Sequence, residues 1–308
     1  MKKLFLLASV ALVLASCSKD DSGSNNNPQN PGQSQQGGGQ PEQPTTPTPV
    51  PVGFVKTIKE YLGEETETAL QKTTTYKVEN NLLKGWEVLT KATGKKQTNT
   101  LTYEGANLKT YKSVDETNGV TEIYTFSYVN NKLDKVTRHR EGDERTIDTY
   151  QITLDPQGRI TKKTHVGNEG WDGQAWEVTF TYTATGVEIQ KAGEPKYTIT
   201  YTGENATRVV QEPSSGVPTD FEYDTTVVND LNNKYIYFVN IAKLFNRWGI
   251  EGYQLTTLDN PFVLNSKNVV KKYLFYTYDI QKNEQNKPSK ITQKDNGGNP
   301  MNIKVYSY

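Results

Sequence analysis

The chain has 308 residues, with 35 basic and 35 acidic side chains, two histidines and one cysteine. This balance, without a basic stripe, excludes an electrostatically driven nucleic-acid-binding protein. One cysteine excludes a disulfide framework, and no segment has the pattern of a cofactor site.

The first 16 residues have the form of a secretory signal peptide. Residues 1–3 are Met-Lys-Lys, and residues 4–14 are apolar apart from Ser9. A helix needs about 20 apolar residues to cross a bilayer, so this run is too short to be a membrane span. A basic start, a short apolar run and small residues at its end predict cleavage and secretion.

The single cysteine follows this segment directly. Leu14-Ala15-Ser16-Cys17 resembles the bacterial lipobox, which implies that Cys17 receives a diacylglycerol and becomes the mature N-terminus. The alternative is an ordinary signal peptide with a cysteine just past the cleavage site. Lipidation would leave no thiol for disulfides, metal binding or nucleophilic catalysis.

The residues after Cys17 suggest a destination. Ser18, Lys19, Asp20 and Asp21 resemble the lipoprotein export signal of Bacteroidota, a lysine followed by acidic residues. The resemblance implies the outer face of the outer membrane. Each buried methylene contributes about 0.8 kcal/mol, so two or three acyl chains would hold the protein on a membrane.

Residues 17–53 are expected to form a tether. They are rich in Asn, Gln, Gly and Pro and have almost no apolar side chain. Such a segment cannot bury enough surface to offset its chain entropy, which predicts disorder. Its root-mean-square reach would be on the order of 30 Å.

Residues 54–308 are expected to form a single all-β domain. Segments such as 177–183 and 197–201 alternate Tyr, Phe, Val or Ile with Thr or Glu. This period of two is typical of an antiparallel sheet with one buried face. The other face carries Thr, Lys, Glu and Gln, whereas a bilayer-spanning barrel needs an apolar outer face. We therefore do not expect the sheet to insert into a bilayer.

The strands recur with a common ending. A strand is followed by a turn rich in Asn, Gly or Asp and then by an apolar residue, as at Leu83, Leu108, Leu133 and Ile160. The interval is about 25 residues, which indicates a repeat of two strands joined by hairpin turns.

The repeat carries a family resemblance. The pattern Tyr-x-Tyr-(Asp or similar)-x-x-Gly-Lys/Arg-Leu resembles the tyrosine–aspartate (YD) repeats of RHS-type proteins. More closely, segments 170–186 and 264–293 are similar to a family of Bacteroides lipoproteins of unknown function with a porin-like fold. The chain departs from the pattern at 154–160 and 223–236. The resemblance implies a large antiparallel hairpin meander, forming a barrel-like or strongly curved sheet, and it implies no activity.

One segment breaks the strand pattern. Residues 233–250 place apolar side chains at nearly helical spacing, with Gly249 as a stop. Strand side chains alone cannot fill the lumen of a barrel of about a dozen or more strands. We therefore hypothesise that this helix plugs or caps the lumen.

No constellation in the sequence predicts catalysis. His139 lies in a charged hairpin, and His165 precedes a glycine turn. Both histidines are expected to be exposed, and the charged side chains of the hairpin are expected to be solvated: Arg138, Arg140, Glu141, Asp143, Glu144 and Arg145. The segments 115–119 and 295–299 resemble calcium loops only superficially, because they lack the ligand series of a 12-residue loop. We expect no catalytic residue, no metal site and no cofactor.

The best candidate binding residues are at a hairpin tip. Trp171 and Asp172 lie in a Gly-rich turn, out of phase with the strand that follows, whereas Trp176 is in phase and expected in the core. An exposed tryptophan can stack on a sugar ring or a partner's apolar patch. It can equally fold back over its own hairpin.

The favoured function is a surface-displayed, non-enzymatic binding or adhesion module, anchored in the outer membrane, with a glycan or surface protein as partner and no nucleic acid. The first alternative is a periplasm-facing carrier with an apolar ligand in the barrel lumen, and the second is a carbohydrate-active hydrolase with two convergent carboxylates. A lumen packed by residues 233–250 would oppose the carrier, and a Tyr-lined cavity would support it. The ligand, the oligomeric state and the closure of the sheet stay open.

Overall fold

The computed structural model describes residues 46–166, 175–213, 218–246, 249–250, 255, 258 and 260–308. The chain divides into two units, 1–43 and 44–308, and the fold below is that of the second unit. Cys17, Ser18 to Asp21, Trp171 and Asp172 lie outside the described residues.

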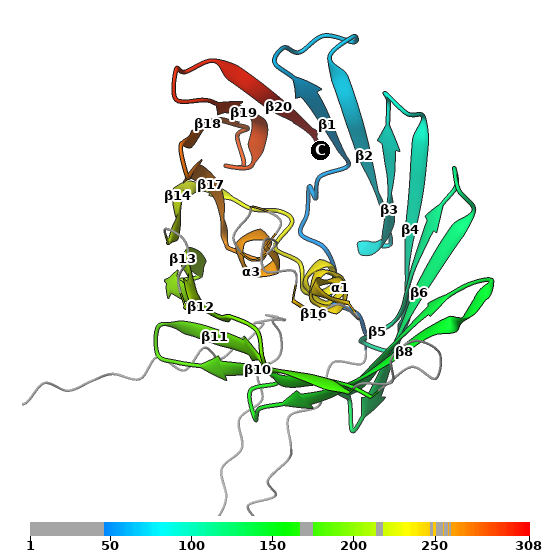
Figure 1. Ribbon diagram of the computed structural model, residues 1–308. Coiled ribbons are helices and arrows are strands. Elements are labelled where there is room, and N and C mark those ends of the chain that lie inside the picture. Colours follow the sequence, from blue (N-terminus) through cyan, green and yellow to red (C-terminus); the bar gives the residue numbers. More distant parts are fainter. Residues whose placement is uncertain are drawn as a thin grey trace, which may run out of the picture. The chain divides into compact units, whose positions relative to one another are not determined.

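The second unit is a closed antiparallel barrel made from one 18-stranded sheet (Figure 1). Each strand pairs with its neighbours along the chain, and β1 pairs with β20 to close the ring, with Lys59 opposite Val305. The strands are β1 (Thr57–Leu62), β2 (Leu70–Glu79), β3 (Leu82–Thr90), β4 (Lys95–Glu104), β5 (Asn107–Asp115), β6 (Val120–Val129), β7 (Lys132–Arg140), β8 (Asp143–Leu154), β9 (Ile160–His165), β10 (Trp176–Tyr182), β11 (Gly186–Lys191), β12 (Lys196–Thr202), β13 (Asn205–Glu212), β14 (Thr219–Val228), β17 (Asn268–Tyr273), β18 (Tyr276–Lys282), β19 (Pro288–Lys294) and β20 (Pro300–Ser307). The all-β prediction is confirmed, and the sheet is closed rather than open.

The apolar face of the sheet points inward and the polar face outward. Successive side chains of a strand alternate between the two faces, and residues paired across strands share a face. On the inside, Phe126, Val136 and Tyr150 are paired in one row and are buried in the core. On the outside, threonines form a corresponding row: Thr102, Thr110, Thr125, Thr137 and Thr149.

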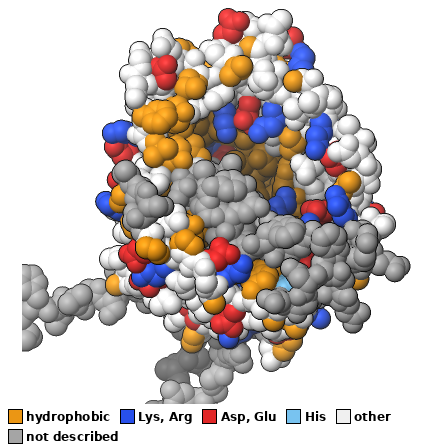
Figure 2. Space-filling view, viewed as in Figure 1, with side chains coloured by type: hydrophobic (Ala, Val, Ile, Leu, Met, Phe, Trp, Pro, Cys, Tyr) orange, Lys and Arg blue, Asp and Glu red, His pale blue; other side chains and the backbone are white. Residues whose placement is uncertain are grey.

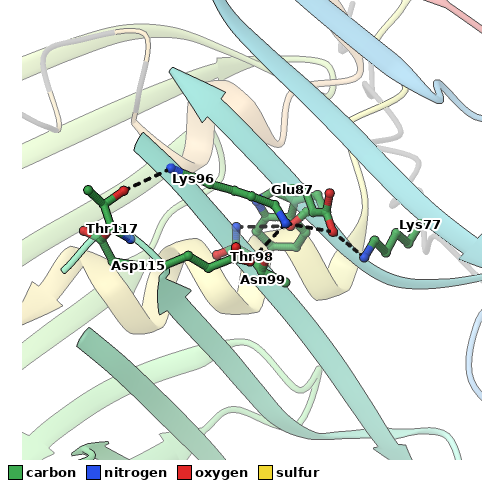
Figure 3. Close-up of polar contacts among 9 residues, drawn as sticks. Lys77, Glu87, Lys96, Thr98, Asn99, Asp115 and Thr117 are labelled. Carbon is green, nitrogen blue, oxygen red and sulfur yellow. Dashed lines mark hydrogen bonds and ion pairs between the residues drawn. The ribbon is translucent and has the colours of Figure 1, made fainter. Parts of the chain in front are cut away.

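Charged side chains cross-link the outer surface (Figure 3). Glu87 of β3 lies 2.6 Å from Lys77 of β2 and 4.0 Å from Lys96 of β4, and Lys96 is 3.2 Å from Glu116. A lipid-facing barrel wall carries a continuous apolar band instead. At these strands the outer surface therefore carries paired charges. In the described part of the chain, no helix is long and apolar enough to cross a membrane.

The 25-residue repeat is explained by tyrosine hydrogen bonds at one rim of the barrel. The Tyr103 hydroxyl donates to the Leu83 carbonyl (2.5 Å), and the Tyr128 hydroxyl donates to the Leu108 carbonyl (3.0 Å). Tyr308 donates to the Pro288 carbonyl in the same way, again 20 residues earlier. Each of these three tyrosines thus ties the end of its strand to a residue at the start of a strand 20 residues earlier.

An insertion between β14 and β17 fills part of the lumen. It contains α1 (Lys234–Leu244), the short strands β15 (Phe245–Asn246) and β16 (Gly249–Ile250), and α3 (Pro261–Leu264). α1 lies inside the ring of strands (Figure 1), where Val239 is fully buried and the Tyr235 hydroxyl donates to the Ala106 carbonyl (3.1 Å). The predicted helix therefore lies inside the barrel and fills part of the lumen, but it leaves a cavity between the insertion and the strands.

The predicted helical range, 233–250, was too long. The helix ends at Leu244, because the chain reverses in a hairpin that pairs Asn246 with Gly249. The pairing of β15 with β16 replaces the helix here, although the apolar spacing continues through the segment.

The chain also enters the lumen ahead of β1. Val50 is buried, its backbone N–H donates to the Asn81 carbonyl (2.7 Å), and the Thr48 N–H donates to the Tyr235 hydroxyl (2.8 Å). The Phe54 ring meets Tyr76 edge to face at 5.5 Å. The boundary that the sequence suggested, between residues 53 and 54, falls within this packed segment.

Candidate ligand-binding site in the barrel lumen

The part of the lumen not filled by α1 holds a cavity of about 440 Å³. It lies between the insertion and the inner faces of β17, β18, β19, β20 and β1. The lining residues are Val55, Glu60, Asn229, Asp230, Leu231, Leu258, Val263, Leu264, Asn268, Val269, Val270, Tyr278, Pro288, Ile291, Gln293, Asn302, Lys304 and Tyr306. Cavities of roughly 300–1,000 Å³ with apolar walls and a few polar groups are typical of small-molecule sites.

The apolar walls come from both the insertion and the barrel. Leu231 and Val263 project from the insertion, whereas Val270 and Ile291 project from the strands. Val270 is paired with Tyr223, whose buried side chain belongs to the core, which fixes Val270 on the inner face.

Two buried polar atoms on the cavity wall have no hydrogen-bond partner: Asp230 Oδ2 and the Tyr278 hydroxyl oxygen. Burial raises the pKa of the Asp230 carboxyl, although the Lys287 ammonium, 3.3 Å from Oδ1, opposes the change. Burial also raises the pKa of Tyr278. An unsatisfied buried polar group costs stability, so both atoms are poised to bond with a ligand.

The cation nearest Asp230 is already engaged. Lys287 Nζ donates to the carbonyls of Val52 (3.1 Å) and Gly53 (2.6 Å) in addition to its contact with Asp230. An ammonium has three donors. Lys287 therefore holds the entering chain in place, and its hydrogen atoms are not available to a ligand.

The polar side chains elsewhere on the cavity wall are paired with one another. Glu60 lies 2.7 Å from Lys72 and 3.7 Å from Lys304, and the Asn302 amide donates to Gln293 (2.7 Å). Figure 2 shows this end of the barrel hollowed, with hydrophobic side chains in the hollow and charged side chains around it. The site thus joins apolar walls, a satisfied polar rim and two unsatisfied polar atoms.

A second polar group of side chains lies on the inner face, and it corrects the sequence prediction. Arg138 lies 2.6 Å from Glu122 and 3.0 Å from Asp148, and His165 lies 3.4 Å from the other oxygen of Asp148. Asp148 and His165 are buried. His165 was expected to be exposed, but its pairing with Tyr150 puts it in the inward row. Arg138 likewise faces inward and does not belong to a solvated hairpin.

Aromatic rings cover this second group, in which the buried Arg138 Nε, His165 Nδ1 and Trp176 Nε1 atoms have no hydrogen-bond partner among the described residues. The Trp176 ring stacks on His165, with 5.3 Å between centroids, and packs against the core as predicted. Burial lowers the pKa of Lys163, which lies over the Tyr150 ring. No group of three or more His, Cys, Asp or Glu side chains among the described residues is placed to hold a metal ion. The cavity, which has room for a small molecule, is therefore the candidate binding site.

The fold is a closed antiparallel barrel whose lumen holds the insertion, a buried polar group and the cavity. No protein-family model matches the chain, and the curated proteins contain no match. Its structural neighbours are porin-like proteins of Bacteroides. One, from Bacteroides uniformis ATCC 8492, has a TM-score of 0.41 and 13% identity over 86% of this chain and 99% of its own. Another, from Bacteroides vulgatus ATCC 8482, has a TM-score of 0.24 and 10% identity over 83% and 98%.

Proposed function

We propose that this protein binds a small amphipathic molecule inside its barrel and acts as a carrier or receptor for it. The observation that supports this most directly is the cavity of about 440 Å³ with two buried, unpaired polar atoms on its wall. Of the functions considered from the sequence, this corresponds to the carrier.

The polar atoms suggest the chemistry of the ligand. Asp230 Oδ2 is a hydrogen-bond acceptor when ionised, and the Tyr278 hydroxyl both donates and accepts. A hydroxyl head group on an apolar body would satisfy both atoms, whereas a carboxylate would be repelled by Asp230 and Glu60. We therefore propose a neutral, hydroxyl-bearing ligand.

Displacement of an apolar fluorescent probe, N-phenyl-1-naphthylamine, tests this function. Val270→Trp should fill the cavity and weaken probe binding at least tenfold. Val305→Trp is the matched control, because Val305 faces outward beside Lys59 and Lys290. Equal binding by the two variants, at equal melting temperature, would place the probe elsewhere and refute the lumen as its site.

Head-group preference is tested in the same assay. We expect 1-dodecanol to displace the probe at lower concentration than dodecanoate, and Tyr278→Phe to weaken the alcohol by about two- to tenfold, the value of one hydrogen bond. Asp279→Asn is the control, because Asp279 lies on the outer face beside Lys294. Identical potency of alcohol and carboxylate would leave the lumen as the site but refute the head-group assignment.

We further propose that Cys17 anchors the barrel in the outer membrane and that Ser18, Lys19, Asp20 and Asp21 direct it to the cell surface. The support is the sequence at the N-terminus. Cys17→Ser should move the protein out of the membrane fraction. Alanine at residues 18–21 should protect the barrel from protease added to intact cells, while the wild type is digested.

A further inference from the structure

The turn between β17 and β18 combines two unfavourable features. It is a two-residue hairpin turn, Leu274–Phe275, with Tyr273 paired to Tyr276 on either side. Leu274 has a φ of 54°, in the left-handed region, and the side chains of Leu274 and Phe275 are 48% and 52% exposed. A bulky residue at positive φ is strained, and large apolar side chains at a turn are exposed to water.

Other turns of the same barrel show what the backbone prefers. Among the described residues other than glycine, the remaining positive-φ positions are all asparagine: Asn80, Asn81, Asn130, Asn131 and Asn286. Asparagine and glycine tolerate this conformation and are the usual residues of such turns. Leu274 therefore stands where the backbone favours Asn or Gly, so its role must be sought outside the turn itself.

The turn lies at the end of the barrel where the cavity has its polar rim. Tyr278, on the cavity wall, follows the turn on β18. The next turn at the same end joins β19 to β20, and Gln293 and Asn302 of the rim flank it. The exposed apolar pair therefore stands beside this end of the lumen.

The surroundings of the turn have the composition of a membrane–water interface. The Phe275 and Tyr276 rings are 4.2 Å apart, and Tyr273 stacks on Phe221 at 5.1 Å. Lys271 and Lys272 precede them, and both are exposed near Glu222. Aromatic rings with adjacent lysines, whose stems lie along apolar surface while the ammonium stays in water, are typical of the head-group region.

We infer that the Leu274–Phe275 turn inserts into the head-group region of a lipid bilayer and sets this end of the barrel against the membrane. A stable protein partner would need about 800 Å² of surface on each side, which a two-residue tip does not offer. Shallow insertion of two side chains suits lipid instead. The lipid anchor proposed at Cys17 would hold the barrel near a bilayer. The inference rests on that proposal, because the anchor would supply the affinity of the protein for the membrane.

The test uses the full acylated chain in vesicles of phosphatidylethanolamine and phosphatidylglycerol. Thr277→Cys places a thiol beside the turn for an environment-sensitive dye, since Cys17 is the chain's one native cysteine and its thiol would be blocked by the proposed acylation. Head-group nitroxide lipids should quench this dye at least twofold more than a dye at Val129→Cys, an exposed residue at the opposite end of the barrel. Adding Leu274→Asn and Phe275→Ser should remove the difference.

Each outcome decides a separate point. Flotation of the protein with the vesicles reports anchoring alone, so failure to float refutes the proposed anchor. Flotation with equal quenching at both positions, or with quenching unchanged in the double variant, overturns insertion of the turn and would direct attention to a protein partner. Probe binding in the lumen is measured without vesicles and does not depend on either result.

Discussion

Tyrosine hydroxyls on the inner face of the barrel fall into two kinds. The Tyr103 hydroxyl donates to the Leu83 carbonyl, whereas the buried Tyr278 hydroxyl has no partner. Losing a bonded hydroxyl leaves a carbonyl unsatisfied, but losing an unpaired one removes a desolvation cost.

We therefore expect Tyr103→Phe to lower the free energy of unfolding by about 1 kcal/mol and Tyr278→Phe to leave it unchanged or raise it. Urea denaturation of the ligand-free protein measures both. A loss of stability in Tyr278→Phe equal to that in Tyr103→Phe would show that the Tyr278 hydroxyl is bonded in the empty protein.

The backbone conformation of a second residue, Leu274, leads to a further prediction. Asparagine adopts a φ near 54° at less cost than leucine, and it removes an apolar side chain from water. Leu274→Asn should therefore stabilise the barrel by about 0.5–1 kcal/mol. Asn80→Leu, the converse change at a φ of 51°, should destabilise it by a similar amount. A lower urea midpoint for Leu274→Asn than for the wild type would show that the backbone of Leu274 is not strained.

Among the elements, the β11–β12 pair depends on a close approach of backbones. A Cβ at Gly186 would lie 2.1 Å from the Ile199 carbonyl oxygen, an atom of the paired backbone that cannot rotate away. Gly186→Ala should therefore cost about 3 kcal/mol or more. Gly203→Ala, at a turn where the added Cβ meets nothing within 4 Å but φ is 60°, should cost only about 1 kcal/mol. Similar urea midpoints for the two variants would refute the steric argument.

The strands were predictable from sequence because their signal is local. Alternation in segments such as 177–183 reports which side chains are buried, and Asn-rich turns mark where strands end. The helix end was not predictable, because the apolar spacing continues into the β15–β16 hairpin. Arg138 and His165 were misjudged on residue type alone. Their positions in the strand alternation would have predicted the inner face. Arg138, for example, is two residues from the inward-facing Val136 and so lies on the same face.

Only part of the candidate site could be predicted from the sequence. Tyr278 alternates in phase with Ile280, so an inward position could have been predicted for it. Asp230 belongs to the irregular start of the insertion, where no period exists to place it. Its environment is set by Lys287 and the lumen, which are brought together only when the barrel closes.

For the molecule as a whole, buried titratable groups set the pH dependence of stability. Burial lowers the pKa of Lys243 to about 8 from 10.5, and it raises the pKa of Tyr182 and Tyr223 to about 12. Between pH 8 and 10.5 the unfolded chain holds the lysine proton that the folded chain has lost, so stability rises with pH. Above pH 10 the unfolded tyrosines ionise first, so stability falls.

We therefore expect maximum stability between about pH 9 and 10. The free energy of unfolding should be about 2 kcal/mol higher at pH 9.5 than at pH 7, from the Lys243 shift. Urea denaturation across this range measures it. Lys243→Met should reduce the rise between pH 7 and 9.5 by about 2 kcal/mol, leaving the part due to the buried Lys163, and should leave the alkaline fall in place. A rise of the same size in Lys243→Met would assign it to another group.

Closure of the ring between β1 and β20 also governs how fast the molecule folds and unfolds. These strands are the first and the last of the barrel in the sequence. Pairing between residues so far apart in the chain forms slowly. Until they meet, both strands present open edges that invite association with other chains. After they meet, the described ring has no edge strand from which to fray, so opening must break a ladder between two paired neighbours. We expect a barrel that is slow to assemble and equally slow to unfold, so that its lifetime is set by its unfolding rate.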